Sequence, residues 1–152
     1  MTTHKQLQVS AIENGTVIDH IPADMLFKVI AILGLDKIDQ QITFGTNLDS
    51  RKLGKKAIIK VAQKFFEADE INKISLVAPD VKLNIIRNYE VVEKREVHIP
   101  DEVIGIVKCF NPKCITNNET VLTRFKVENK KDLALKCHYC EKITTKDELK
   151  MV

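Results

Sequence analysis

The sequence has little of what a membrane protein or a nucleic-acid-binding protein needs. Its longest apolar stretch, MLFKVIAILGL, is interrupted by Lys28 and is too short to span a bilayer. Aromatic residues make up 5% of the chain and tryptophan is missing, so few rings are available to stack on bases. The 24 basic and 21 acidic residues are mixed along the chain, which gives a net charge of +3 and no concentrated basic face. We therefore expect neither a membrane nor a nucleic acid as a partner.

The chain also lacks the pattern of a secretion signal and the common catalytic motifs. The first residues, MTTHKQLQVSAIENG, do not place a charged segment before an apolar one, so we expect a cytoplasmic protein. The motifs G-x-S-x-G, H-E-x-x-H and G-x-G-x-x-G are missing. The segment LGKKAIIK places Gly54 before two lysines, as a phosphate loop does, but it lacks that motif's first glycine and closing serine or threonine. The sequence therefore shows no recognisable catalytic site.

The N-terminal part, residues 1–97, has the apolar pattern of a mixed α+β domain. Four apolar residues within 26–33 lie at i, i+3, i+4 and i+7, which predicts a helical face that ends at Gly34. The same spacing within residues 58–65 predicts a second helix from about residue 55. Extended segments are predicted at residues 6–12, 15–21, 40–48, 73–79, 81–88 and 89–94. Together these elements predict a small sheet with helices packed on one face.

A charged segment with Pro100, EKREVHIPDE, marks a boundary between residues 95 and 101 and separates a second domain at residues 98–152. Beyond it the pattern is all-β, because VIGIVKC, ETVLTRFKV and DLALKC each alternate apolar and polar residues. Only the tail TKDELKMV favours a helical turn. A domain of about 50 residues buries little apolar surface and usually needs a metal ion or disulfides to be stable.

All four cysteines of the chain lie in this second domain, at Cys109, Cys114, Cys137 and Cys140. In a cytoplasmic protein, two close pairs in a C-x4-C…C-x2-C pattern favour metal binding over disulfides. Four thiolates about 2.3 Å from Zn²⁺ form a closed tetrahedral site that has no position for a reactive water. Such an ion contributes about 10–16 kcal/mol to the folding of zinc-finger peptides. We expect one structural Zn²⁺ per chain, held by these cysteines.

Two other interpretations of the cysteine pattern come from different functional classes. A zinc-ribbon protein that binds nucleic acid would show a salt-dependent gel shift, although the balanced charge and few aromatic residues argue against it. A rubredoxin-like electron carrier would hold iron on the same thiolates and would be red. His138 lies between two of the cysteines and is an alternative ligand, but four cysteines already complete the coordination shell.

The pair Asp19–His20 lies inside the apolar segment TVIDHIP. Strand alternation sends the two side chains to opposite faces, so one of them is expected to point to the interior or a cleft. One interpretation is a hydrogen-bonded structural pair at the end of a strand. The other is the polar rim of a ligand site, with Lys60 and Lys94 as positive charges for a phosphorylated ligand. The residues alone do not choose between them, since exposed lysines are usually solvated.

Several segments closely resemble the regulatory chain of bacterial and archaeal aspartate carbamoyltransferase. They are LQVSAIENGTVIDHIPA, ITFGTNL, KLGKKAIIKV, NIIRNYEVVEK and CFNPKCI…LALKCHYCEK, and the resemblance runs from about residue 7 to residue 142. The resemblance implies a ferredoxin-like α/β sandwich followed by a small rubredoxin-like zinc-ribbon domain. It implies a non-catalytic allosteric subunit of pyrimidine biosynthesis, which binds CTP as inhibitor and ATP as activator, with UTP acting beside CTP in some members. The zinc domain docks on the catalytic chain, and regulatory dimers join two catalytic trimers.

By position, the resemblance also implies the residues of a nucleotide site. Val9 and Ile12 would lie near the base and Asp19 and His20 near the ribose and phosphates, and the remaining members are Lys60, Tyr89, Val91 and Lys94. In this scheme Lys94 and His20 suit the triphosphate, and backbone groups around Ile12 and Tyr89 read an exocyclic amino group. Lys56 and Asn84 are candidates for supporting roles. The sequence departs from the family pattern at Gln6 and Ser10, close to the expected triphosphate.

Overall fold

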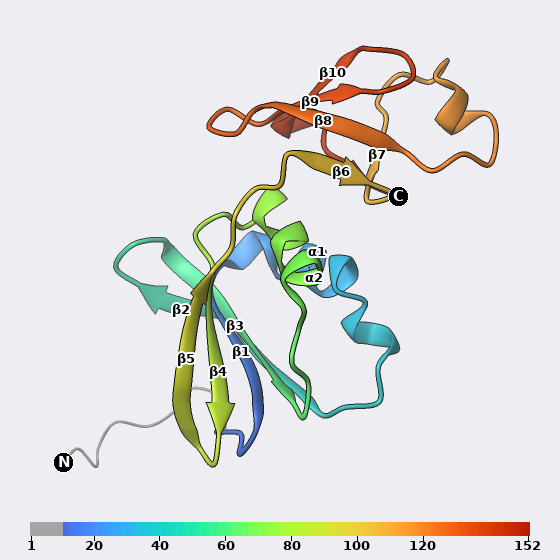
Figure 1. Ribbon diagram of the computed structural model, residues 1–152. Coiled ribbons are helices and arrows are strands. Elements are labelled where there is room, and N and C mark those ends of the chain that lie inside the picture. The colour runs from blue at the N-terminus through green and yellow to red at the C-terminus, as the bar shows by residue number, and fades with distance from the viewer. Residues whose placement is uncertain (1–10) are drawn as a thin grey trace. The chain divides into compact units, whose positions relative to one another are not determined.

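The computed structural model describes residues 11–152, and the chain divides into two compact units, Met1–His98 and Ile99–Val152 (Figure 1). Most of the strand predicted at residues 6–12 lies outside the described residues, as do Gln6 and Ser10 and the proposed nucleotide contact Val9. No helix in the described part of the chain is long and apolar enough to cross a bilayer.

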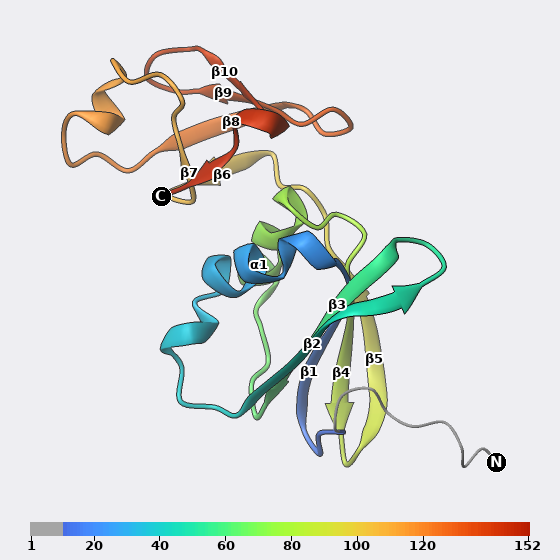
Figure 2. The same cartoon turned by 180° about the vertical axis from the view of Figure 1, so that it is seen from behind.

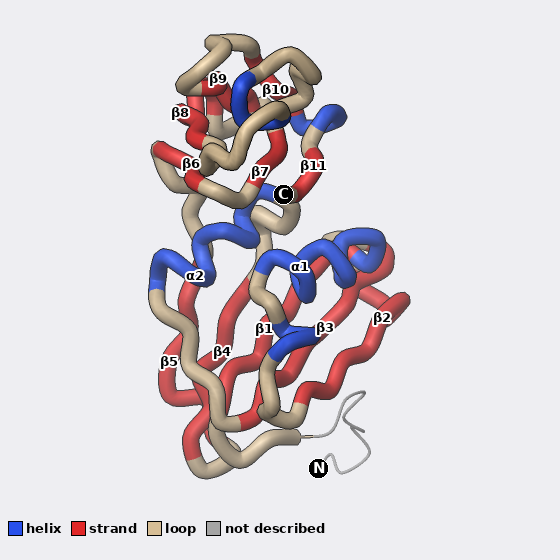
Figure 3. Tube along the Cα trace, turned by 90° about the vertical axis from the view of Figure 1, so that its right-hand side faces the viewer, coloured by secondary structure: helices blue, strands red, loops and turns tan. Residues whose placement is uncertain are grey.

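Unit 1 is built on a β-α-β-β-α-β pattern with one further strand. Its sheet has the order β2-β3-β1-β4-β5, and every neighbouring pair is antiparallel (Figure 2). Both helices lie on the same side of this sheet (Figure 3). The element pattern and strand order are those of a ferredoxin-like fold, which confirms the predicted fold class. The elements are β1 Gly15–Pro22, α1 Leu26–Ile32, β2 Ile42–Ser50, β3 Gly54–Ala62, α2 Ala68–Asn72, β4 Lys82–Arg87 and β5 Glu90–Glu96.

The core of unit 1 lies between the sheet and the two helices. Alternate residues of the three central strands are fully or almost fully buried, among them Ile18, Ile59 and Leu83. These three occupy one row across the sheet, since Ile18 pairs with Ile59 on β3 and with Leu83 on β4. The helices contribute buried apolar residues such as Leu26 and Ile71. The intervening residues of the strands point to the opposite face of the sheet, which we call the open face because neither helix covers it.

Helix α1 forms where the apolar spacing predicted it. Leu26 and Val29 are fully buried, one helical turn apart. The helix ends just before Gly34, whose φ of 64° lies in the left-handed region that glycine adopts without strain. The prediction of a helix that stops at this glycine is confirmed.

The predicted helix from residue 55 is wrong, because residues 54–62 form strand β3. Ala57, Ile59 and Val61 alternate along the strand and are all fully buried against the helical layer. The β-branched residues of this segment favour a pleated strand between two neighbours. Ile58 is half-buried on the other face, so apolar residues occur at both strand and helix spacings and the period alone misleads.

The predicted strand at residues 73–79 is also wrong. Helix α2 and the 3₁₀ turn Lys73–Leu76 occupy residues 68–76. The helix begins at a capping box, in which the Glu67 side chain accepts from the backbone of Glu70 and the Glu70 side chain accepts from the backbone of Glu67. The run from Ile74 to Ala78 is buried throughout, and a short buried helix and a buried strand look alike in such a run.

Strands β4 and β5 are joined by the two-residue turn Asn88–Tyr89. Both residues have positive φ, 53° and 67°, as a type I′ hairpin turn requires. The turn is attached to the segment before β1, because the Asn88 N–H donates to Asn14 Oδ1 at 3.2 Å and the Tyr89 N–H donates to the Glu13 carbonyl at 2.9 Å. The tip of the hairpin is therefore held against residues 13–14.

Unit 2 is all-β, as predicted, apart from short 3₁₀ turns. Its core contains Val103, Phe125 and Leu135, each at most 1% exposed. The predicted helical turn of the tail is present at Lys146–Glu148, but the residues after it form a strand. One sheet has the order β10-β9-β8-β6 and a second pairs β11 with β7. The strands are β6 Glu102–Ile104, β7 Val107–Lys108, β8 Arg124–Asn129, β9 Ala134–Cys137, β10 Ile143–Thr145 and β11 Lys150–Met151.

Candidate metal and nucleotide sites

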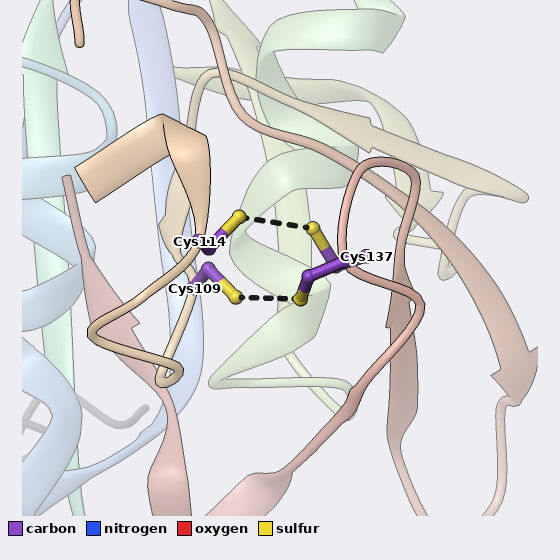
Figure 4. Close-up of side chains that lie close together, drawn as sticks. Cys109, Cys114 and Cys137 are labelled. Atoms are coloured by element: carbon purple, nitrogen blue, oxygen red, sulfur yellow. Dashed lines mark hydrogen bonds between the residues drawn. The ribbon is translucent and has the colours of Figure 1, made fainter. Parts of the chain in front are cut away.

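The four cysteines of unit 2 bring their sulfur atoms together, and Figure 4 labels three of them, Cys109, Cys114 and Cys137. Cys109 follows β7 and Cys114 precedes a 3₁₀ turn, whereas Cys137 ends β9 and Cys140 lies in the turn after it. The Sγ atoms of Cys109 and Cys140 are 3.6 Å apart, those of Cys114 and Cys137 are 3.7 Å apart, and all four ligand atoms lie within 4.8 Å of one another. Zinc–sulfur bonds of about 2.3 Å give a tetrahedron with edges of about 3.8 Å. The sulfur positions therefore fit a tetrahedral metal ion.

Backbone N–H groups point at these sulfur atoms from the two turns. Cys109 accepts a hydrogen bond from the Asn111 N–H, Cys137 from the Tyr139 and Cys140 N–H groups, and Cys140 from the Lys142 N–H. Hydrogen bonds to a charged acceptor are stronger than those to a neutral one, so this arrangement suits thiolates. The turns thus supply the second layer of contacts that orients metal ligands.

The thiols differ in how readily they lose a proton. Burial raises the pKa of Cys109 to about 12 and also raises the pKa of Cys137. Burial alone would raise the pKa of Cys140 too, but hydrogen bonds from the Lys142 backbone and the Asn111 side chain outweigh it and bring the value to about 7. A bound divalent cation supplies the positive charge that keeps all four ligands deprotonated.

Part of the predicted nucleotide site forms one row across the open face of unit 1. Lys60 on β3 pairs with Val17 on β1, Val17 with Asn84 on β4, and Asn84 with Lys94 on β5. Residues in one such row have side chains on the same face of the sheet. The strand pairing thus brings together Lys60 and Lys94, which the sequence separates by 34 positions (94 − 60). Asn84, predicted only as a supporting residue, lies between them.

Asp19 lies on the same face, next to the row. Its carboxylate is 2.9 Å from the ammonium group of Lys56, and both side chains are mostly buried. Burial lowers the pKa of Lys60, which is 8% exposed, and the negative charge of Asp19 opposes that shift. The site therefore combines a carboxylate with two lysines that are largely withdrawn from solvent.

The expectation that Asp19 and His20 point to opposite faces is wrong. The pairing of β1 with β3 is irregular between Ile18 and Ile21, and His20 has a φ of 62° in the left-handed region. This bulge breaks the alternation of side chains. It places His20 Nδ1 3.8 Å from Asp19 Oδ1, while the His20 backbone N–H donates to the same oxygen at 2.6 Å.

The other predicted contacts lie along the edge near the β4–β5 turn. Val91 on β5 is exposed and pairs with Ile86 on β4. Tyr89 is in the turn, with its side chain 67% exposed, and its backbone contacts Glu13, the neighbour of Ile12. The Tyr89 backbone is thereby held next to the residue that follows Ile12, whereas Val9 lies outside the described residues.

Comparison with known proteins matches both units to one family. Residues 7–98 match the family described as aspartate carbamoyltransferase regulatory chain, allosteric domain, and residues 101–150 match its metal binding domain. The chain belongs to the aspartate carbamoyltransferase regulatory chain family. It is 60% identical over 153 residues to the regulatory chain of Bacteroides fragilis, covering all of both chains, and 61% identical over 150 residues to that of Bacteroides thetaiotaomicron, covering 98% of each. It is 56% identical over 138 residues to that of Thermococcus sibiricus, covering 91% of each.

Membership of the aspartate carbamoyltransferase regulatory chain family assigns a role to each unit. The chain is a non-catalytic subunit, and a regulatory chain implies a catalytic chain as its partner. The open face lies in the allosteric domain and the cysteine cluster in the metal-binding domain. The predicted identification of the family is confirmed.

Some residues that support the metal site in this regulatory chain were missed from sequence. Thr116 Oγ1 lies 3.2 Å from Cys114 Sγ as a donor. The side-chain amide of Asn117 donates to the carbonyls of Cys109 and Asn111, at 2.9 and 2.7 Å, and so fixes the first cysteine turn. The polar run ITNN directly after Cys114 is the sequence signal for this support, because such side chains commonly bond to nearby backbone. His138, by contrast, is exposed and stacks edge-on against Tyr139.

Proposed function

We propose that the chain binds nucleoside triphosphates on the open face of unit 1 and passes their effect to a catalytic chain docked on unit 2. In this proposal CTP inhibits and ATP activates, with UTP acting together with CTP. Regulatory dimers join catalytic trimers, and the assembly controls pyrimidine biosynthesis. The observation that carries the proposal is the row that places Lys60, Asn84 and Lys94 on one face of the allosteric domain.

The two lysines of the row are spaced for a long ligand. Lys60 and Lys94 are separated by three strand-to-strand steps, and at about 4.8 Å per step their backbones lie about 14 Å apart. Side chains stand roughly perpendicular to a sheet, so the two ammonium groups contact different parts of a ligand. Within residues 11–152 no carboxylate is within ion-pair distance of Lys94, whereas Lys82 is paired with Glu96. Lys94 is thus available for phosphate oxygens.

The remaining contacts suit a sugar and a base. Asp19 can accept hydrogen bonds from ribose hydroxyls, and His20 beside it can donate to phosphate. Lys60, two residues before the end of β3, can donate to base or ribose oxygens. The backbone groups near Ile12 and Tyr89 offer the hydrogen bonds that recognise an exocyclic amino group, which cytosine and adenine both carry. Val9 and Val91 would pack against the base.

For unit 2 we propose that the ion is Zn²⁺, one per chain, with a purely structural role. Four sulfur ligands at tetrahedral spacing suit zinc better than magnesium or calcium, which prefer oxygen. Four cysteines kept as metal ligands and not as disulfides fit a reducing compartment, so we propose that the protein works in the cytoplasm.

Calorimetric titration of the zinc-loaded chain with CTP and with ATP tests the nucleotide proposal. Both nucleotides are expected to bind, and saturating CTP is expected to abolish the heat of ATP binding, because one site serves both. Inorganic triphosphate is the control for binding through charge alone, and it is expected to bind more weakly. Independent binding of CTP and ATP, or no binding of either, would contradict a shared effector site on the open face.

A further inference from the structure

The chain leaves unit 1 through a short segment that is fastened to the helical layer. Strand β5 ends at Glu96, and the next residue, Val97, is 6% exposed. His98 is the last residue of unit 1, and Ile99 and Pro100 lead into unit 2. Whatever fixes the backbone of His98 therefore fixes the point from which the connection to unit 2 starts.

Two side chains, one at the end of α2 and one in the 3₁₀ turn after it, contact both polar backbone groups of His98. The His98 N–H donates to Asn72 Oδ1 at 3.1 Å. The hydroxyl of Ser75, which is 2% exposed, lies 3.3 Å from the His98 carbonyl and 2.5 Å from the Asn72 carbonyl. Since a hydroxyl has one proton, the closer Asn72 carbonyl is its main acceptor and the His98 carbonyl is the alternative. Asn72 and Ser75 therefore form a clamp around a single peptide segment.

The clamp joins two layers that carry different parts of unit 1. Strand β5 holds Lys94 on the open face, four residues before His98, and continues directly into the clamped segment. Asn72 and Ser75 belong to the helical layer on the other side of the sheet. If β5 is displaced slightly relative to α2, either Asn72 and Ser75 move together with the His98 backbone or their hydrogen bonds to it break. The clamp is the place where such a displacement reaches the connection to unit 2.

We propose that Asn72 and Ser75 are positioning residues that transmit the nucleotide effect from β5 to the connection at Ile99–Pro100. The proposal rests on nucleotide binding at the open face, as described above. Neither residue lies on that face, so in this proposal neither contacts the nucleotide. Allosteric coupling requires an element whose state both sites influence, and the clamped segment is such an element.

The test uses the intact complex of regulatory and catalytic chains with the substitution Asn72→Ala. The dissociation constant of the zinc-loaded regulatory chain alone for CTP is expected to stay within about twofold of wild type, because the substitution removes no proposed nucleotide contact. The change in carbamoyl transfer that CTP and ATP each cause is expected to fall to less than half. Asn72→Asp is the matched control, because it keeps an oxygen acceptor opposite the His98 N–H, and it is expected to retain the nucleotide response.

A second measurement does not depend on any variant. Hydrogen exchange of the His98 amide in the wild-type complex is expected to change when CTP is added, while amides of β8 in unit 2 do not. The proposed role of the clamp, but not the effector site, would be contradicted by either of two results. One is an equal nucleotide response in Asn72→Ala and wild type. The other is a His98 amide whose exchange rate does not change when CTP is added. Loss of the nucleotide response in Asn72→Asp as well would also contradict it, because this variant keeps the oxygen that accepts from the His98 N–H. A wild-type chain that binds no nucleotide overturns the proposed effector site first and the clamp with it.

Discussion

Substitution of Cys114 by alanine is expected to unfold unit 2 and to abolish assembly with the catalytic chain, while unit 1 stays folded. The substitution removes one of the four sulfur atoms whose spacing fits a tetrahedral metal ion. Metal binding contributes about 10–16 kcal/mol in zinc-finger peptides, as much as the whole stability of a typical domain of about 5–15 kcal/mol. Unit 2, at residues 99–152, has no large core with which to compensate.

The measurement is zinc content together with size-exclusion chromatography of the variant mixed with the catalytic chain. Loss of bound zinc, loss of dispersed NMR signals from unit 2 and separate elution of the two chains are expected. His138→Ala is the matched control, because this histidine lies between two of the cysteines yet is exposed. It is expected to keep one zinc per chain and to assemble normally. Normal assembly of the Cys114→Ala chain would show that the metal is not what holds unit 2 together.

Removal of the amino group of Lys60 is expected to give the largest loss of nucleotide affinity. A hydrogen bond that involves a charged group contributes about 1.5–3 kcal/mol, so Lys60→Ala should weaken CTP binding about 10- to 150-fold. Lys94→Ala should have an effect of the same order, since it removes the other lysine of the row. The control is Lys55→Ala, on the same strand but exposed and paired with Asp49. Calorimetry should find its affinity unchanged, and equal losses in all three variants would point to a non-specific charge effect.

The titration of Lys60 adds a signature that general damage to the fold does not produce. Burial lowers its pKa from the ordinary value of 10.5, so part of the Lys60 population is neutral at alkaline pH. An anionic ligand favours the charged form and raises the pKa again. Between the lowered pKa and 10.5, CTP binding should therefore take up a fraction of a proton per chain. Calorimetry in two buffers of different ionisation enthalpy measures this uptake, which Lys60→Ala should remove.

The fold could be predicted where local chemistry decides the structure. Gly34 ends α1 because it enters the left-handed region freely, and the buried Leu26 and Val29 lie one helical turn apart, as the spacing predicted. Strand β3 was missed because a strand between two neighbours carries apolar residues on both faces, and Ile58 completed a helical spacing by coincidence. What decides in favour of a strand is the pairing of β3 with both β1 and β2, and that information is tertiary.

The metal site and the nucleotide site also differ in how far the sequence predicts them. The cysteine cluster follows from spacing alone, because two close pairs of thiols in a small domain have few other uses. The nucleotide residues follow from the resemblance to a family, whereas their common row depends on which residues of four strands lie opposite one another. The bulge at His20 could not be predicted from the sequence, because it breaks the alternation of side chains on which the prediction of strands relies. Strained backbone of this kind recurs at functional sites.

The turn at Asn88–Tyr89 influences which residues of β4 and β5 lie opposite one another. Side chains alternate along a strand, so a slip of one residue between β4 and β5 would rotate Lys94 to the helical side of the sheet. The positive φ angles of the two turn residues set the pairing next to the turn, and a bulge in β5 opposite Ile85 and Ile86 then sets the pairing of Lys94 with Asn84. Asn88, to which we assign no ligand contact, therefore contributes to the position of Lys94. Variants that lose the response to nucleotides should accordingly occur at residues that never touch a nucleotide.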